Sequence, residues 1–173
     1  MLLRAHVPVR APLRTRRHVS VSAAAQRSTH TTPDGLALEV LRCAPAAASR
    51  RPPLLFVHGS FHAAWCYEEH WLPYFAAAGY DAYSLSLRGQ GGSAARPGGG
   101  AAGTLEEHAA DVASLARALP GGPPVLLGHS FGGLVVQQAV SARCADAPPV
   151  AGVALLCSVP PNGNSEMVRP VCS

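Results

Sequence analysis

Short apolar runs alternate with helix-compatible stretches along most of this chain. The runs have three to seven residues and lie between turn-forming residues, at 54–57, 80–85, 125–127 and 150–156. Runs bounded in this way are typical of strands buried on both faces of a parallel sheet, and the helical stretches between them supply the crossovers. We therefore expect an α/β fold, with a mostly parallel sheet and flanking helices.

The expected helices have recognisable ends. Pro73 kinks or restarts the first helix, and Gly79 closes it. Thr104 and Glu107 form a capping-box pattern, so a second helix begins directly after Thr104. The elements expected besides the central runs are helices over 67–78, 105–119 and 131–142 and a strand over 36–41.

The net charge of +4 belongs to the N-terminal part of the chain. All 14 basic residues are arginine, and six of them precede Asp34, the first acidic residue. From Asp34 onward eight arginines face ten acidic residues, so this part carries a net charge of −2. No basic face remains to bind nucleic acid. Every apolar window is also too short for a membrane span.

Residues 1–32 have the composition of an organellar transit peptide, with Arg, Ala, Ser and Thr and no acid. A chloroplast address is expected, with the mitochondrion or the cytoplasm as alternatives, and a disordered tail is the simpler interpretation of the same segment. The expected organisation is a leader over 1–32, a partial domain over 33–165 and an irregular tail over 166–173.

The five cysteines show neither a C-x-x-C spacing nor a disulfide pattern, and most are expected to be buried thiols. No metal site and no cofactor are predicted, and the sequence does not indicate an oligomeric state.

The sharpest motif is a G-x-S-x-G pentapeptide around Ser130, with Gly128, His129 and Gly132 in the other defined positions. It follows an apolar strand and opens an apolar helix, as a nucleophile elbow requires. The small neighbours let the backbone turn sharply, and the helix N-terminus favours developing negative charge. We therefore predict Ser130 as the nucleophile; a plain glycine-rich turn is the alternative.

A second motif follows the run at 54–57. His58 and Gly59 end that strand, and Ser60 comes next in the loop. An oxyanion hole needs two N–H groups from different loops, aimed at one point. The predicted donors are the backbone N–H groups of Ser60 and of Phe131, the residue after Ser130. The simpler interpretation of His58 and Gly59 is a strand-ending turn with a hydrogen-bonded histidine.

The order of these motifs resembles the N-terminal half of the α/β-hydrolase superfamily, in its esterase, lipase and C–C hydrolase branch. The resemblance covers about residues 36–161 and includes the segment 88–93, which is similar to the R-G-x-G-x-S loop of that family. It implies a serine hydrolase that acts on a small-molecule acyl or ester substrate, with the roles of Ser130, Ser60 and Phe131 given above.

The family's triad continues, in chain order, with an acid and a histidine. After Ser130 the sequence contains only Asp146 and Glu166 as acids and no histidine. Asp146 precedes the last expected strand, so Glu166 is the only positional candidate. His58, His62 and His129 lie near the motifs but lack the family's position for a base. Two further histidines are expected elsewhere: His70 on a helix surface, and His108 as a hydrogen-bonded core residue.

A C-terminally truncated hydrolase, inactive or nearly so, is therefore the first interpretation. Its last strand, 150–156, would be an exposed apolar edge. The alternative is a non-catalytic binding or regulatory fragment of the same fold. Lyase or acyltransferase chemistry also remains open, because one fold hosts several chemistries.

Overall fold

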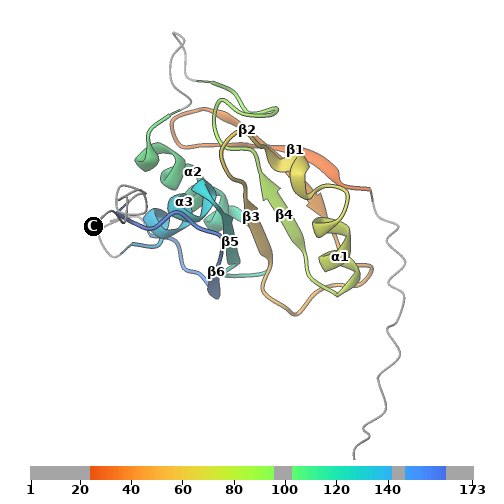
Figure 1. Ribbon diagram of the computed structural model, residues 1–173. Helices are drawn as coiled ribbons and strands as arrows, with labels where there is room; N and C mark the ends of the chain where they lie inside the picture. The colour runs from red at the N-terminus through yellow and green to blue at the C-terminus, as the bar shows by residue number, and fades with distance from the viewer. Residues whose placement is uncertain (1–23, 96–102, 142–146, 163–173) are drawn as a thin grey trace, which may run out of the picture.

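The computed structural model describes residues 24–95, 103–141 and 147–162. The strands of these residues form one sheet in the order β1-β2-β4-β3-β5-β6 (Figure 1). They are β1 (Gln26–Thr31), β2 (Ala37–Cys43), β3 (Leu54–Val57), β4 (Ala82–Leu85), β5 (Val125–His129) and β6 (Gly152–Leu156). The strands β3 to β6 run parallel, and β1 and β2 form an antiparallel margin. The expected mostly parallel α/β sheet is confirmed.

Helices cover both faces of the sheet (Figure 1). One face carries α2 (Leu105–Ala118) and α3 (Phe131–Ala139), and the other carries the 3₁₀ turn η1 (Ala64–Tyr67) and α1 (Trp71–Ala77). Each face has its own hydrophobic cluster. Because β3 to β6 run parallel, the loops that follow these strands lie along one edge of the sheet.

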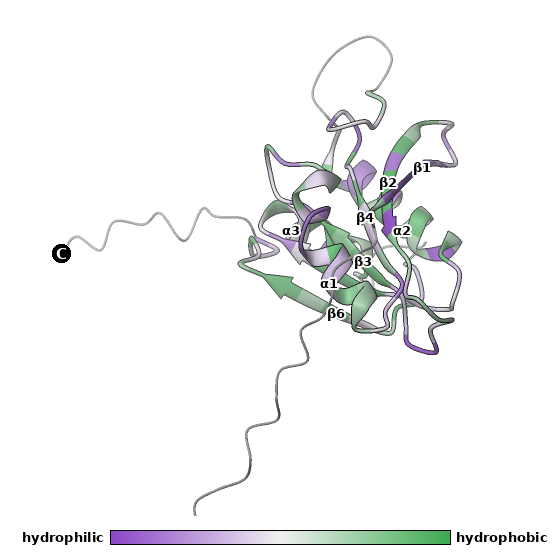
Figure 2. Cartoon of the chain, turned by 90° about the vertical axis from the view of Figure 1, so that its right-hand side faces the viewer, coloured by the Kyte–Doolittle hydropathy of each residue, from purple (hydrophilic) through white to green (hydrophobic). Residues whose placement is uncertain are grey.

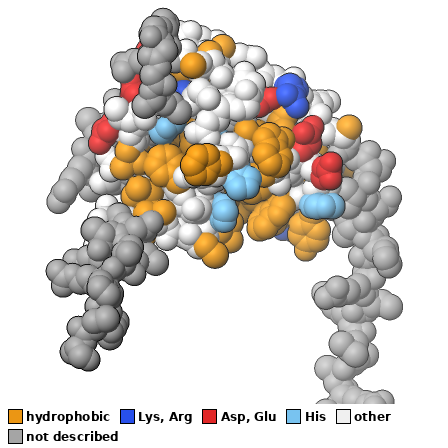
Figure 3. Space-filling view, turned by 45° about the horizontal axis from the view of Figure 1, so that its top comes forward, with side chains coloured by type: hydrophobic (Ala, Val, Ile, Leu, Met, Phe, Trp, Pro, Cys, Tyr) orange, Lys and Arg blue, Asp and Glu red, His pale blue; other side chains and the backbone are white. Residues whose placement is uncertain are grey.

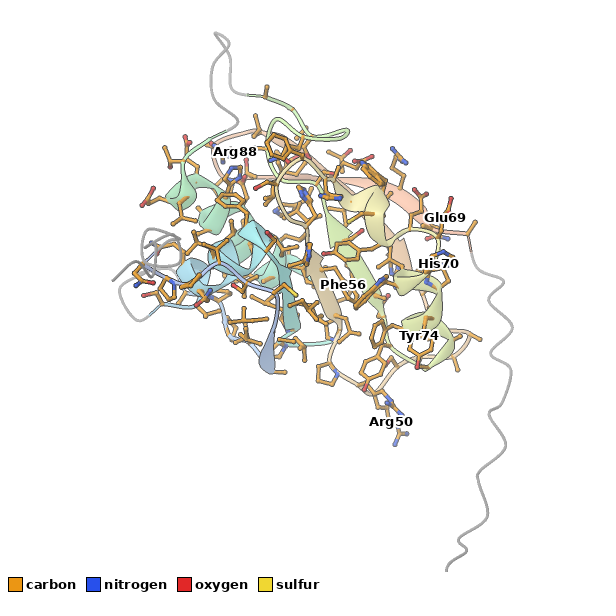
Figure 4. The ribbon with its side chains drawn as sticks, viewed as in Figure 1. Arg50, Phe56, Glu69, His70, Tyr74 and Arg88 are labelled. Carbon is orange, nitrogen blue, oxygen red and sulfur yellow. The ribbon has the colours of Figure 1, made fainter. Side chains whose placement is uncertain are left out.

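The central strand β3 shows why its sequence is apolar without interruption. Leu55 and Val57 belong to the cluster under α2 and α3, while Leu54 and Phe56 belong to the cluster under α1 (Figure 4). Successive side chains of a strand point to opposite faces. Because both faces are covered, all four positions are buried and none can be polar without a partner.

The first helix differs from its expected form. Residues 64–67 form a 3₁₀ turn, and α1 starts separately at Trp71. Pro73 is the third residue of α1, in the first turn, where the backbone N–H groups have no intrahelical acceptor. Proline therefore removes no hydrogen bond there. Gly79 follows the helix with φ +89°, as a closing glycine should.

The other boundaries agree with expectation within a few residues. Thr104 Oγ1 accepts the Glu107 N–H at 3.2 Å and Glu107 Oε2 accepts the Thr104 N–H at 2.8 Å, so the predicted capping box is confirmed. The helix expected over 131–142 ends at Ala139, and residue 142 lies outside the described residues. The strand expected over 36–41 spans 37–43 instead.

The sheet begins earlier than the predicted domain boundary at residue 33. The strand β1 pairs with β2 from Gln26 to Thr31, inside the segment assigned to the leader. Arg27 of β1 forms an ion pair with the buried Glu39 of β2. These residues therefore contribute to the sheet. Residues 1–23 and the tail 166–173 lie outside the described residues, so the leader and the tail stay predictions.

The other margin of the sheet is β6, which pairs with β5 alone in the described part of the chain. Its side chains are apolar, as the green arrow in Figure 2 shows. Val153 and Leu155 are 41% and 45% exposed. The expected exposed apolar edge is therefore present. Among the described helices, none has the length and hydropathy that crossing a membrane requires.

Candidate active site

Ser130 occupies the turn between β5 and α3 in a strained backbone conformation. Its φ of 53° and ψ of −119° lie where side chains other than glycine are rarely found. Such a conformation costs on the order of 1–3 kcal/mol and persists only when the surrounding structure enforces it. The Ser130 N–H donates to the Leu156 carbonyl at 3.0 Å, and its carbonyl accepts the Val159 N–H at 3.1 Å. The end of β6 therefore holds this turn in place.

Close packing of α3 against the end of β3 explains the glycine at position 132. A Cβ there would lie 2.3 Å from the His58 carbonyl oxygen and 2.4 Å from that of Val57. Only a residue without a side chain fits this approach. A Cβ on Gly59 would likewise lie 3.0 Å from the Ser130 Cβ. The two loops that the sequence singled out therefore meet at one point.

The backbone N–H groups of Ser60 and Phe131 have no hydrogen-bond acceptor among the described residues. Both residues line the same cleft, which has a volume of about 590 Å³. The Phe131 N–H also lies at the N-terminus of the nine-residue helix α3, where the helix dipole favours negative charge. Two unused donors from two loops at one cleft are the arrangement that an oxyanion hole requires.

The cleft wall combines aromatic and uncharged polar side chains. Hydrophobic and histidine side chains gather on this face of the molecule (Figure 3). The lining residues are Ser60, Phe61, His62, Ala63, Trp65, Gln90, Gly91, Gly103, His108 and Phe131. None of these residues is an arginine, a lysine, an aspartate or a glutamate. Gln90 and Gly91 belong to the segment 88–93 that resembles the family's loop, whereas no motif predicted Trp65 or His108 at this wall.

His58 has a structural role at the base of the oxyanion loop. It is fully buried, its Nδ1 bonds the Gly59 carbonyl oxygen at 2.8 Å, and its Nε2 accepts the Leu87 N–H at 3.0 Å. Burial lowers the pKa of His58 to about 4. A neutral ring with both nitrogens engaged joins the loop after β3 to the loop after β4. The hydrogen-bonded interpretation of His58 is therefore the one that the geometry supports.

The loop that starts at Arg88 is fixed by buried charges. Arg88 donates from Nε and Nη2 to the Asp111 carboxylate at 2.7 and 2.5 Å, at the end of the sheet beside α2 (Figure 4). Hydrogen bonding to Asp111 raises the pKa of the Arg88 guanidinium. Glu39 accepts from Ser86 Oγ at 2.6 Å and from the Gly92 N–H at 2.9 Å. These contacts position Gln90 and Gly91 at the cleft.

The Ser130 hydroxyl makes no hydrogen bond among the described residues. His62 Nδ1 bonds the Ser60 carbonyl oxygen at 2.9 Å. His70 is exposed, as expected, but it directly precedes α1 and is not part of that helix. Asp146 and Glu166, the acids considered from the sequence, lie outside the described residues.

His108 differs from its predicted hydrogen-bonded state. Its side chain is 3% exposed, as predicted for a core residue. Its Nδ1, however, has no partner in the part of the chain that the structure describes.

The described histidines, cysteines and acids do not form any group of three that could hold a metal ion. Of the described cysteines, Cys43 is buried as expected, but Cys157 is exposed.

Comparison with known proteins gives one consistent family. Residues 54–171 match the model of the alpha/beta hydrolase family. The chain is 36% identical over 96 residues to Esterase PIR7B of Oryza sativa subsp. japonica. The aligned region is 54% of this chain and 35% of that esterase. It is 38% identical over 87 residues to the probable esterase PIR7A of Oryza sativa subsp. indica, covering 50% and 32% of the two chains. The chain thus spans about a third of the length of these curated relatives.

Solved structures show the same similarity. An epoxide hydrolase from an endophytic Streptomyces has 29% identity and a TM-score of 0.63, over 79% of this chain and 38% of its own. A putative aryl esterase from Burkholderia cenocepacia has 26% identity and a TM-score of 0.61, over 78% of this chain and 47% of its own.

Proposed function

Because the chain belongs to the alpha/beta hydrolase family, we propose that it is a serine hydrolase acting on carboxylic esters, with Ser130 as the nucleophile. One observation carries the proposal: the strained Ser130 lies beside Phe131 and close to the Gly59–Ser60 loop, and Ser60 and Phe131, whose N–H groups have no acceptor among the described residues, line one cleft. The similarity to two rice proteins described as esterases supports the substrate class.

The proposed reaction is acyl transfer in two halves. The Ser130 Oγ bonds to the ester carbonyl carbon while the carbonyl electron pair moves onto oxygen, and the two N–H groups bind the resulting oxyanion. Collapse of this intermediate breaks the bond to the alcohol, which takes up a proton and leaves. Water then adds to the acyl-serine in the same way, which releases the acid and restores the hydroxyl.

A serine in the elbow favours esters over epoxides, although epoxide hydrolases are among the similar structures. Attack of a serine oxygen on an epoxide carbon would open the ring and form an ether. Water does not cleave an ether under these conditions, so the enzyme would not turn over. Attack on an ester forms a new ester, which water can hydrolyse.

The proton on Ser130 needs a base, and no described histidine or carboxylate is hydrogen-bonded to the Ser130 hydroxyl. We therefore propose that the 173-residue chain alone turns over esters slowly. In triad enzymes, loss of one member lowers kcat by about 10⁴-fold or more. The same observation keeps the non-catalytic binding fragment as the second candidate, since that candidate also needs the cleft but no reaction at Ser130.

Acylation by p-nitrophenyl acetate tests the proposal. We expect slow addition of one acetyl group, mapped by mass spectrometry to Ser130, because acyl-serine accumulates when no base activates water. The chain has no lysine, so no lysine amine competes for the acetyl group. Styrene oxide should leave Ser130 unmodified or add to it irreversibly, without turnover. An unmodified Ser130 in a folded chain would favour the binding fragment.

A pair of variants tests the oxyanion donors in the same assay. Ser60→Ala keeps the backbone N–H and should acylate like the wild type, whereas Ser60→Pro removes the N–H and should acylate at least about 100-fold more slowly. Circular dichroism checks that both variants fold. Equal acylation by the two variants would exclude Ser60 as a donor.

A further inference from the structure

His108 is a buried cleft residue that the proposed reaction does not use. It lies on α2, and its ring packs edge-on against the ring of Phe131, with centroids 5.7 Å apart at an angle of 85°. Phe131 follows the nucleophile and supplies one proposed oxyanion donor. His108 therefore lies at the cleft wall, against the residue that follows the proposed nucleophile.

The charged neighbours of His108 are engaged elsewhere. The Asp111 carboxylate, on the same helix, accepts two hydrogen bonds from Arg88. The Glu107 carboxylate accepts the Thr104 N–H at 2.8 Å and lies 3.4 Å from Arg88. Neither carboxylate bonds His108 among the described contacts. The ring therefore keeps its own hydrogen-bonding capacity.

The His108 ring can both donate and accept a hydrogen bond. Burial lowers the pKa of His108, so its imidazole is neutral at pH 7, with one N–H donor and one acceptor nitrogen. The ring lines the cleft, so a ligand hydroxyl there can supply a hydrogen bond that no described residue makes to the His108 ring.

The rest of the wall defines the kind of ligand. Phe61, Trp65 and Phe131 offer aromatic surface, and Gln90 adds an uncharged amide. Among the described residues, the lining contains no arginine, lysine, aspartate or glutamate, so a charged group would lose its hydration there without an ionic partner. A volume of about 590 Å³ is within the range of small-molecule sites.

We propose that His108 determines specificity by bonding an uncharged hydroxyl group on the aromatic half of the ester substrate. The inference rests on the proposed function only for the position of the reacting carbonyl, near Ser130. The substrates expected in the cleft are therefore neutral aromatic esters that carry a hydroxyl group.

A matched ligand pair tests this without chemistry at Ser130. N-(4-hydroxybenzyl)acetamide and N-benzylacetamide differ by one hydroxyl, and both dissociation constants follow from NMR titration of the full chain. We expect the hydroxylated ligand to bind about 3- to 10-fold more tightly, as one net hydrogen bond predicts. His108→Phe should remove this preference, and His62→Phe should retain it. Ser130→Ala should also retain it, since the serine is not involved.

A second measurement does not depend on the folding of a variant. In wild-type chain labelled with ¹⁵N-histidine, an imidazole nitrogen signal of His108 should shift with the hydroxylated ligand and not with its parent. Equal affinities of the two ligands, or a preference lost in His62→Phe alone, would overturn the inference. If acetylation of Ser130 occurs while the preference is absent, the proposed function stands and the specificity role fails. If the preference is present while Ser130 is not acetylated, His108 is a binding residue in a non-catalytic fragment.

Discussion

Ser130 and His58 show how single residues build this site. The positive φ of Ser130 is tolerated because hydrogen bonds from the β6 end hold its backbone on both sides. His58 is neutral because burial lowers its pKa, and both of its ring nitrogens are bonded to backbone groups. Ser130 therefore holds a strained backbone conformation at the turn, and His58 stabilises the loop after β3 beside it.

The depressed pKa of His58 makes stability depend on pH. Between pH 6.5, its ordinary pKa, and pH 4, its folded value, the unfolded chain binds a proton that the folded chain does not. Stability is therefore greatest above pH 6.5 and falls as the pH drops toward 4, by up to about 3 kcal/mol from this group. Urea unfolding at pH 7, 5.5 and 4 measures the effect.

His58→Gln should reduce this dependence, because the glutamine amide does not titrate. Part of it should remain, because burial also lowers the pKa of His30 and His108. The exposed His70→Gln serves as control and should follow the wild type. An identical pH dependence in His58→Gln and wild type would contradict the role given to His58.

At the scale of elements, the turn from β5 into α3 depends on contact with the end of β3. Gly132→Ala would place a methyl group against two backbone carbonyl oxygens that cannot move aside. We expect it to destabilise the fold by about 3 kcal/mol, at the upper end for overpacking. Gly152→Ala is the matched control: its Cβ would lie 3.9 Å from Val125, an ordinary contact. Urea unfolding compares the two variants, and similar stabilities would refute the close approach.

The elements with strong local patterns could be predicted from the sequence. The strand at 54–57 was expected with the same bounds, and the capping box at Thr104 has the expected contacts. The strand β1 could not be predicted, because its polar residues give no apolar run, and it is held by pairing with β2 and by the Arg27–Glu39 ion pair. Tertiary pairing overrides weak local preference there.

The cleft was only partly predictable, for a similar reason. The motifs at Ser130 and Ser60 follow strands directly, so their meeting at one edge follows from a parallel sheet. His108 and Gln90 reach the same cleft from a helix and a long loop. Their positions depend on how α2 packs and on the Arg88–Asp111 pair, which no local pattern reveals.

At the scale of the whole molecule, the described sheet ends in an apolar strand with one neighbour. Val153 and Leu155 on β6 are partly exposed, and an exposed apolar edge can pair with another copy of the chain. We expect concentration-dependent self-association of the 173-residue chain, reduced in Val153→Lys. Ala151→Lys adds the same charge beside β6 but outside the strand, and should not reduce it. Analytical ultracentrifugation measures the association, and equal effects of both variants would exclude the edge.

The most direct test of the proposed chemistry is the rate at which a fluorophosphonate labels the purified 173-residue chain, with the labelled residue mapped by mass spectrometry. We expect a single labelled residue, Ser130, no labelling in Ser130→Ala, and a rate about 10⁴-fold below that of a complete serine hydrolase. Labelling at another residue, or unchanged labelling in Ser130→Ala, would contradict the assignment of the nucleophile. Labelling of Ser130 as fast as in a complete enzyme would contradict the absence of a base.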